Sequence, residues 1–168
     1  MSSIDQIEEI GKLLTEAKRI SRRYKQLTGK PLGITGEVAE FEAAHRLGLQ
    51  LVDARTPGYD ATRAEGSATA RIQVKGRSYP RSARETGQRI GSWDFRQPWD
   101  EVVLVLMDED FEVRELLRAS RAQIEDRLKR LPPGKDGKQT RTHKGALTVP
   151  LFRSIAKAGI PQSDGGKP

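Results

Sequence analysis

The chain has no cysteine and only two histidines among its 168 residues. Without cysteine it forms neither disulfides nor thiolate zinc sites. The two histidines, His45 and His143, are too few for a metal site built from several imidazoles. Their contexts predict a packing residue on a helix for His45 and an exposed loop residue for His143. These absences exclude disulfide-stabilised folds and thiolate-rich or histidine-rich metal proteins.

Long apolar runs are also missing. No stretch approaches the roughly 20 apolar residues that cross a membrane. Asp5, Glu8 and Glu9 interrupt the apolar residues near the N-terminus, which is unlike a secretory signal peptide. We therefore expect a cytoplasmic protein that makes no membrane contact. The length suits one domain over residues 1–160, followed by a disordered tail over 161–168.

Aromatic residues make up only 5% of the chain. Three of them, Trp93, Phe95 and Trp99, cluster just before the most apolar segment of the sequence. This position predicts packing in the core and at the edges of strands rather than a platform for stacking bases.

Basic residues are in excess, with 30 Lys and Arg against 23 Asp and Glu and a formal net charge of +7. This balance favours a polyanionic partner, and nucleic acid comes first. Basic residues crowd the span 63–96, and the candidates for contacts to a phosphate backbone are Arg77, Arg81, Arg84 and Arg89. A second basic segment contains Lys135, Lys138, Arg141 and Lys144.

Apolar residues at steps of three and four predict a long amphipathic helix over residues 3–28. Its first turns are acidic, and its last turns are basic. The apolar face is wide enough both to dock on the rest of the chain and to pair with a second copy. A homodimer through this helix is therefore one possible assembly.

The rest of the chain predicts an α/β domain with a mixed central sheet flanked by helices. Thr35 is expected to cap a helix that ends at Gly48, and Ser120 with Gln123 forms a capping box for a helix to Leu131. Strands are expected over 49–52, 59–64, 71–78, 102–107, 111–117 and 147–150. A loop is expected over 80–92, a basic loop over 134–145 and a final helix over 151–158.

Two short segments carry the chemistry. Asp60 follows the turn Pro57-Gly58-Tyr59, and Gln73-Val74-Lys75 lies in the strand thirteen residues later. Side chains alternate along a strand, so Gln73 and Lys75 share a face. The Asp60 carboxylate, the Gln73 amide oxygen and the Val74 carbonyl are oxygen ligands suited to Mg²⁺ or Mn²⁺. Lys75 lies where it can assist water or a scissile phosphate.

Asp60 followed by Gln73-Val74-Lys75 resembles the PD-(D/E)xK nuclease superfamily, which includes many restriction endonucleases and archaeal Holliday-junction resolvases. Upstream, Gly33-Ile34-Thr35-Gly36-Glu37 and Leu47-Gly48 look like the resolvase helix pattern. This match carries the family's helix carboxylate onto Glu37, and Glu40, one turn later, can share or replace that role. The resemblance covers about residues 33–107.

The resemblance implies a restriction-endonuclease-like fold and a Mg²⁺-dependent endonuclease that hydrolyses phosphodiester bonds of DNA. Glu37, Asp60, Gln73 and Lys75 would be its catalytic residues. Two features depart from the pattern: Gly58 and Tyr59 separate Pro57 from Asp60, and Gln73 stands where the family has Asp or Glu. The alternative is a catalytically inactive nucleic-acid-binding module of the same fold in a defence or repair complex.

Overall fold

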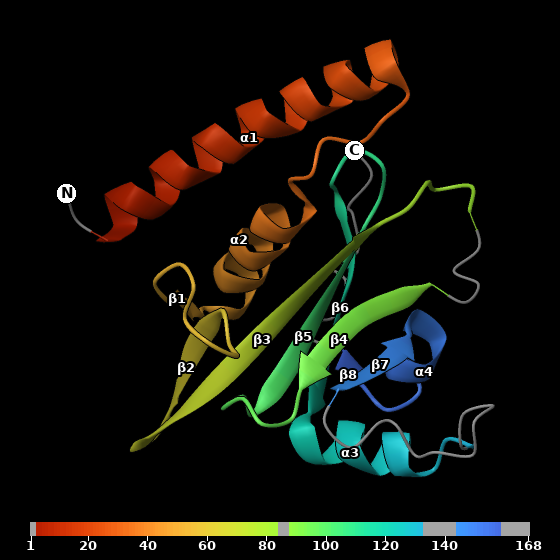
Figure 1. Ribbon diagram of the computed structural model, residues 1–168. Coiled ribbons are helices and arrows are strands. Elements are labelled where there is room, and N and C mark those ends of the chain that lie inside the picture. Colours follow the sequence, from red (N-terminus) through yellow and green to blue (C-terminus); the bar gives the residue numbers. More distant parts are fainter. Residues whose placement is uncertain (1–2, 84–87, 133–143, 159–168) are drawn as a thin grey trace, which may run out of the picture.

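The computed structural model describes residues 3–83, 88–132 and 144–158 and has a mixed α/β architecture (Figure 1). Six strands form one sheet in the order β1-β2-β3-β5-β6-β8, and β4 pairs with β7 in a second, two-stranded sheet. Helices α1 and α2 lie on one side of the large sheet, and α3, α4 and the small sheet lie on the other. The mixed sheet flanked by helices that the sequence predicts is confirmed at this level.

The helices are α1 (Ser3–Thr28), α2 (Thr35–Leu47), α3 (Arg121–Lys129) and α4 (Val149–Arg153). The strands are β1 (Gln50–Leu51), β2 (Ala61–Glu65), β3 (Ala68–Ser78), β4 (Arg89–Asp94), β5 (Glu101–Met107), β6 (Val113–Ser120), β7 (Lys144–Thr148) and β8 (Lys157–Ala158).

Strand β3 pairs with β2 over only the first part of its length. It pairs antiparallel with β2 from Ala68 to Ile72, and parallel with β5 from Ile72 to Ser78. Residues 73–78 therefore have β5 on one side, while the side toward β2 is an open edge within the described chain. Open edges present backbone N–H and C=O groups that need other partners.

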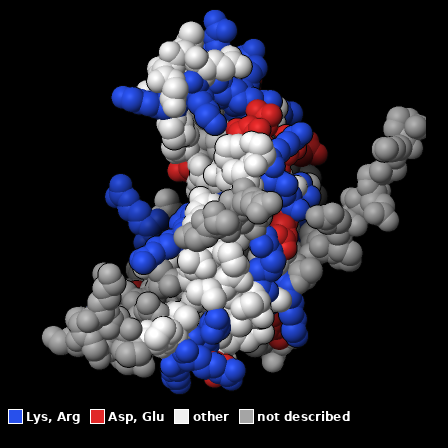
Figure 2. Space-filling view, turned by 90° about the vertical axis from the view of Figure 1, so that its right-hand side faces the viewer, with Lys and Arg blue, Asp and Glu red and all other residues white. Residues whose placement is uncertain are grey.

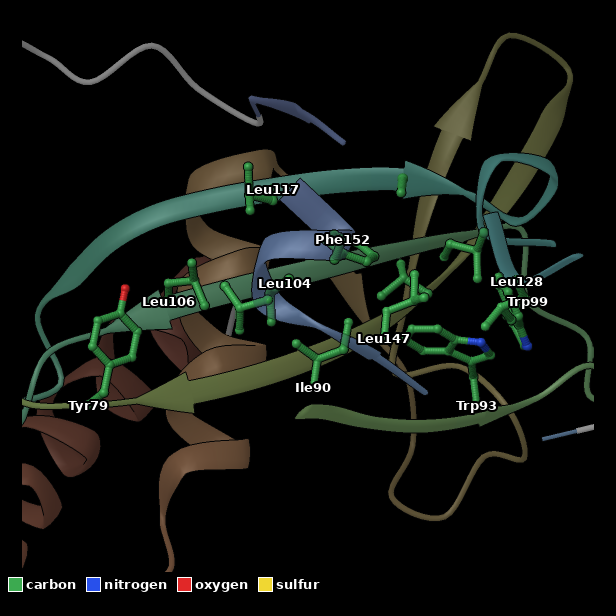
Figure 3. Packing of buried hydrophobic residues seen from close by; sticks show 14 residues of the cluster. Tyr79, Ile90, Trp93, Trp99, Leu104, Leu106, Leu117, Leu128, Leu147 and Phe152 are labelled. Carbon is green, nitrogen blue, oxygen red and sulfur yellow. The ribbon is translucent and has the colours of Figure 1, made fainter. Parts of the chain in front are cut away.

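The central strand β5 is buried on both faces, as its continuous apolar sequence predicts. Val103, Val105 and Met107 face α2, and the alternate residues face the opposite core. Figure 3 shows that opposite core, in which Trp93 and Trp99 pack with residues of β4, β6 and α4. Both tryptophans are almost fully buried, which confirms a packing role for these rings.

Helix α2 packs tightly on the sheet because small residues meet there. Val38, Ala39 and Ala43 are buried, and a Cβ at Gly76 of β3 would lie 2.6 Å from the Ala39 Cβ. The helix ends as predicted at Gly48, which adopts a left-handed conformation with φ 63°. The prediction that Thr35 is the cap is wrong: Ile34 occupies the N-cap, and no side chain caps the helix there.

The predicted N-terminal helix is confirmed by α1 and lies over α2 at the outside of the molecule (Figure 1). It docks through one face. The Phe41 ring approaches Gly11, Lys18 Nζ lies 3.0 Å from Glu42 Oε1, and Ser21 is buried. No helix in the described part of the chain is long and apolar enough to cross a membrane.

Three predicted segments differ from the structure. The expected loop over 80–92 contains the start of β4, because Ile90 and Trp93 are buried and the strand finds its partner in the distant β7. The strand expected from Phe111 begins at Val113, since Phe111 closes a turn with φ 64°. The expected helix over 151–158 is the shorter α4, capped by Thr148, and the chain then pairs with β6 as β8.

The strand expected over 147–150 is β7, which ends at Thr148. The capping box of Ser120 and Gln123 is confirmed at the start of α3. Residues 161–168, His143 and most of the basic segment 134–145 lie outside the described residues.

Candidate functional site

The candidate site lies where β2 stops pairing with β3. The Asp60 N–H donates to the Ile72 carbonyl at 2.8 Å, and the Val74 N–H donates to Asp60 Oδ2 at 2.7 Å. The Asp60 carboxylate thus accepts the first hydrogen bond that β2 no longer provides at this edge. This fixes the side chain against β3, and within the described residues only one of its two oxygens accepts a hydrogen bond.

Gln73 supplies a second oxygen beside Asp60 in the strand register. Its Oε1 atom is buried and has no hydrogen-bond partner within the described residues. A buried polar atom without a partner costs on the order of 1–3 kcal/mol, so native proteins usually satisfy it with water or an ion. The amide oxygen therefore fits the ligand role that the sequence predicts for Gln73.

The Val74 carbonyl is the third predicted ligand. In a strand, the N–H and C=O of one residue point toward the same neighbouring strand. Because the Val74 N–H points to Asp60, the Val74 carbonyl also faces the open edge. The backbone thus presents a neutral oxygen on the same side as the Asp60 carboxylate.

Glu40 of α2 adds a carboxylate to this edge. Burial first, and then the nearby carboxylates of Asp60 and Glu37, raise the pKa of Glu40 to about 7, while Lys75 opposes the shift. Excess negative charge is therefore concentrated around a partly buried group. Glu37 is exposed in the first turn of α2, whereas Glu40 interacts with both Asp60 and Lys75. Of the two helix carboxylates that the sequence leaves open, Glu40 is the better placed, whereas the resemblance favours Glu37.

Lys75 shares its face of β3 with Gln73 and interacts electrostatically with Asp60 and Glu40. Burial lowers the pKa of Lys75; the Asp60 and Glu40 carboxylates oppose this, and the neighbouring Arg77 adds to it. A lysine held below its usual pKa can exchange a proton closer to neutral pH. The structure thus brings together Asp60, Lys75 and Glu40, and the strand register adds Gln73 and Val74.

The raised pKa of Glu40 predicts a pH-dependent stability. The folded, metal-free chain holds this proton up to about pH 7, against an ordinary value of 4.5. Because the folded state binds more protons between these values, the free energy of unfolding should fall as pH rises from 4.5 to 7. The Glu40→Gln variant should lack this fall. At pH 8 its free energy of unfolding should exceed that of the wild type by about 1–2 kcal/mol, after allowing for solvent screening.

Chemical denaturation at pH 4.5 and pH 8 in the presence of EDTA measures this difference. The exposed Glu37 provides the matched control as Glu37→Gln, for which a smaller change is expected. A stability difference between Glu40→Gln and the wild type that is equal at both pH values would contradict the prediction.

A cleft of about 410 Å³ runs along the open edge of β3. Lys75 and Arg77 line it from the strand, and Thr35 and Gly36 line it from the start of α2. Gln88, just before β4, also lines it. Thr35 and Gln88 were not among the predicted site residues, because only the packing of α2 and β4 around β3 brings them here.

The described residues contain no group of three or more His, Cys, Asp or Glu side chains arranged to hold a metal ion. A cation at this edge would therefore need neutral oxygens besides carboxylates. The Gln73 amide and the Val74 carbonyl have that chemistry, and both suit a hard ion such as Mg²⁺.

The predicted phosphate contacts have different surroundings. Arg77 Nε donates to the Arg89 carbonyl at 2.8 Å, which ties the side chain to β4. Arg81 pairs with the buried Asp108 at 2.7 Å, and the Arg89 side chain is exposed. Arg84 lies outside the described residues. Figure 2 shows further basic side chains crowded at the top of one face, where α1 ends in Figure 1.

The sequence was also compared with known proteins. No protein-family model matches the chain, and no curated protein sequence matches it either.

Proposed function

We propose that this protein is a metal-dependent endonuclease that hydrolyses phosphodiester bonds of DNA at the open edge of β3. The observation that carries the proposal is the buried Gln73 oxygen, which has no hydrogen-bond partner within the described residues and belongs to the strand that holds Asp60 and carries Lys75. Oxygen donors, surplus negative charge and a lysine of lowered pKa together are what metal-assisted phosphodiester hydrolysis requires.

The order of the elements supports the finer assignment to a restriction-endonuclease-like fold. A helix with a carboxylate, α2, precedes the antiparallel pair β2–β3, and the apolar strand β5 follows in parallel with β3. The resemblance to PD-(D/E)xK nucleases implies a helix followed by the strands that hold the aspartate and the Gln-x-Lys segment. Asp60 directly precedes β2, and Gln73 and Lys75 lie on β3, as that resemblance also implies.

In the proposed site, Asp60, Gln73 and the Val74 carbonyl would hold Mg²⁺ or Mn²⁺, and Glu40 or Glu37 would complete the set. A bound divalent ion lowers the pKa of a coordinated water and neutralises charge on the phosphate. Lys75 Nζ would hold a proton near the attacking water or donate a hydrogen bond to a phosphate oxygen. The Asp60 side chain, fixed by the Val74 N–H, would orient this arrangement.

The direct test is incubation of the purified protein with single-stranded, duplex and branched DNA in Mg²⁺ or Mn²⁺. We expect cleavage of at least one substrate, and its loss in EDTA. Calorimetry distinguishes this nuclease from the alternative, a nucleic-acid-binding module that does not cleave. The lack of charge on Gln73 favours that alternative. Salt-sensitive DNA binding without any binding of Mg²⁺ or Mn²⁺ would indicate a nucleic-acid-binding module that does not cleave.

Changing the charge at Gln73 tests the ligand role. Gln73→Glu restores the acidic residue of the family pattern and should tighten Mn²⁺ binding roughly tenfold, about 1.4 kcal/mol, because Mn²⁺ prefers charged oxygen ligands. Gln73→Leu should weaken binding. Titration calorimetry measures both affinities. The matching substitutions Gln50→Glu and Gln50→Leu, at an exposed glutamine of β1, are the controls. Unchanged affinity in both Gln73 variants would remove Gln73 from the metal site.

A further inference from the structure

Helix α1 carries an apolar stripe that its docking on the domain does not cover. Its members follow one another at alternating steps of three and four: Ile10, Leu13, Ala17, Ile20, Tyr24 and Leu27. Leu13 is 57% exposed, Ile20 56% and Leu27 72%. Large apolar side chains gathered in this way on one surface mark an interaction site more often than a solvated face.

The docked residues of α1 occupy a different face of the same helix. Gly11, Lys18 and Ser21 contact the domain, and each directly follows a stripe residue in the sequence. Successive residues on a helix are about 100° apart, because one turn takes about 3.6 residues. The stripe can therefore accept a partner while α1 remains packed over α2.

The spacing of the stripe identifies the kind of partner. Alternating steps of three and four over six positions are the a and d positions of a heptad repeat, which pack against another helix. The stripe extends over about 25 Å of helix at 1.5 Å per residue. A second amphipathic helix of similar length is the surface that matches it.

The charges along α1 identify that helix as a second copy in antiparallel orientation. The acids lie mainly in the first half of the helix: Asp5, Glu8, Glu9 and Glu16. The bases gather in the second half: Lys18, Arg19, Arg22, Arg23 and Lys25. Two parallel copies would place acid beside acid and base beside base, whereas two antiparallel copies place each acidic half along a basic half.

We propose that the protein self-associates through an antiparallel pair of α1 helices. In the register that aligns the stripes, Ile10 faces Leu27 of the second copy, and Leu13 faces its Tyr24. Ala17 then faces Ile20 at the centre, a small residue against a large one. Glu16, which flanks the stripe, meets Arg23 of the second copy. In a parallel pair Glu16 would instead lie beside Ser21, which is already buried against its own domain.

The seam is short, so the dimer should be reversible and dependent on concentration. Interfaces below about 1,200 Å² of total buried area belong to weak or transient complexes. Sedimentation equilibrium of the full chain from about 1 to about 300 µM should show the average mass rising toward twice that of the chain, since Kd values near 1 µM to 1 mM are expected for weak complexes.

Removing the apolar seam tests its role. The double variant Leu13→Asp with Ile20→Asp should remain monomeric over the same range, because both side chains are exposed and neither is needed for docking. Leu51→Asp changes an exposed leucine of β1 in the same way and should dimerise like the wild type. A wild type that stays monomeric throughout, or a double variant that still dimerises, would overturn the proposal.

Exchanging the flanking charges tests the orientation. Glu16→Arg alone should weaken association several-fold, as should Arg23→Glu alone, and the double exchange should restore it, because the pair re-forms in an antiparallel dimer. Absence of restoration would refute this register. Binding of the wild type to anionic phospholipid vesicles without self-association would also refute it and would assign the stripe to a membrane surface. None of these readouts depends on DNA cleavage, so they stand or fall separately from the proposed nuclease activity.

Discussion

Replacing Asp60 by asparagine should lower the rate of DNA cleavage about a thousandfold while leaving the protein folded. An asparagine Oδ1 can still accept the hydrogen bond from the Val74 N–H that holds this edge in place. What it lacks is the negative charge that would hold a divalent cation, and loss of such electrostatic stabilisation typically costs about 10²–10³ in rate. Initial rates on the substrate that the wild type cleaves best, at saturating Mg²⁺, measure the change.

A companion variant separates the charge of Asp60 from its hydrogen bond. Asp60→Ala removes both the charge and the acceptor, so it should lose stability as well as activity, by about 1–3 kcal/mol for the unsatisfied Val74 N–H. Retained Mn²⁺ binding and cleavage in Asp60→Asn would mean that Asp60 only stabilises the strand edge.

Lys75→Met tests the lysine. Its rate of DNA cleavage should fall about 10²–10⁴-fold below that of the wild type, which is the usual contribution of general acid–base catalysis. Exposed Lys30→Met is the control.

The sequence was most informative where local patterns determine the structure. The period of the apolar residues located α1, and the continuous apolar run located β5. Alternation along β3 placed Gln73 and Lys75 on one face. These features depend on neighbours within a few residues, which is why they could be read before the fold was known.

Other features required the tertiary structure. Strand β4 has one glycine and three polar residues among six, and it becomes a strand through pairing with β7, some 50 residues away. Glu37 and Glu40 are one turn apart on the same side of α2, so sequence spacing could not decide between them. That choice depends on where α2 rests against β3, and hence on the close contact at Gly76.

Gly76→Ala should therefore be among the most destabilising single changes in the chain. An added Cβ would lie 2.6 Å from the Ala39 Cβ and 2.7 Å from the Thr35 carbonyl oxygen, and a backbone atom cannot rotate away. Overpacking of this kind usually costs about 1–3 kcal/mol, and the backbone contact places Gly76→Ala near the upper end of that range. Chemical denaturation gives the free energy of unfolding.

Gly36→Ala is the matched control, since Gly36 also lies in α2 near the cleft but has open space around its Cα. Alanine has a higher helix propensity than glycine, so the free energy of unfolding of this variant should rise by up to about 1 kcal/mol. If Gly76→Ala were as stable as Gly36→Ala, α2 would not rest on β3 as closely as the structure shows. If Gly76→Ala folds but α2 is displaced, Glu40 should move away from Asp60 and Lys75. Mn²⁺ affinity should then fall together with stability, which would tie the helix carboxylate to the site through a single glycine contact.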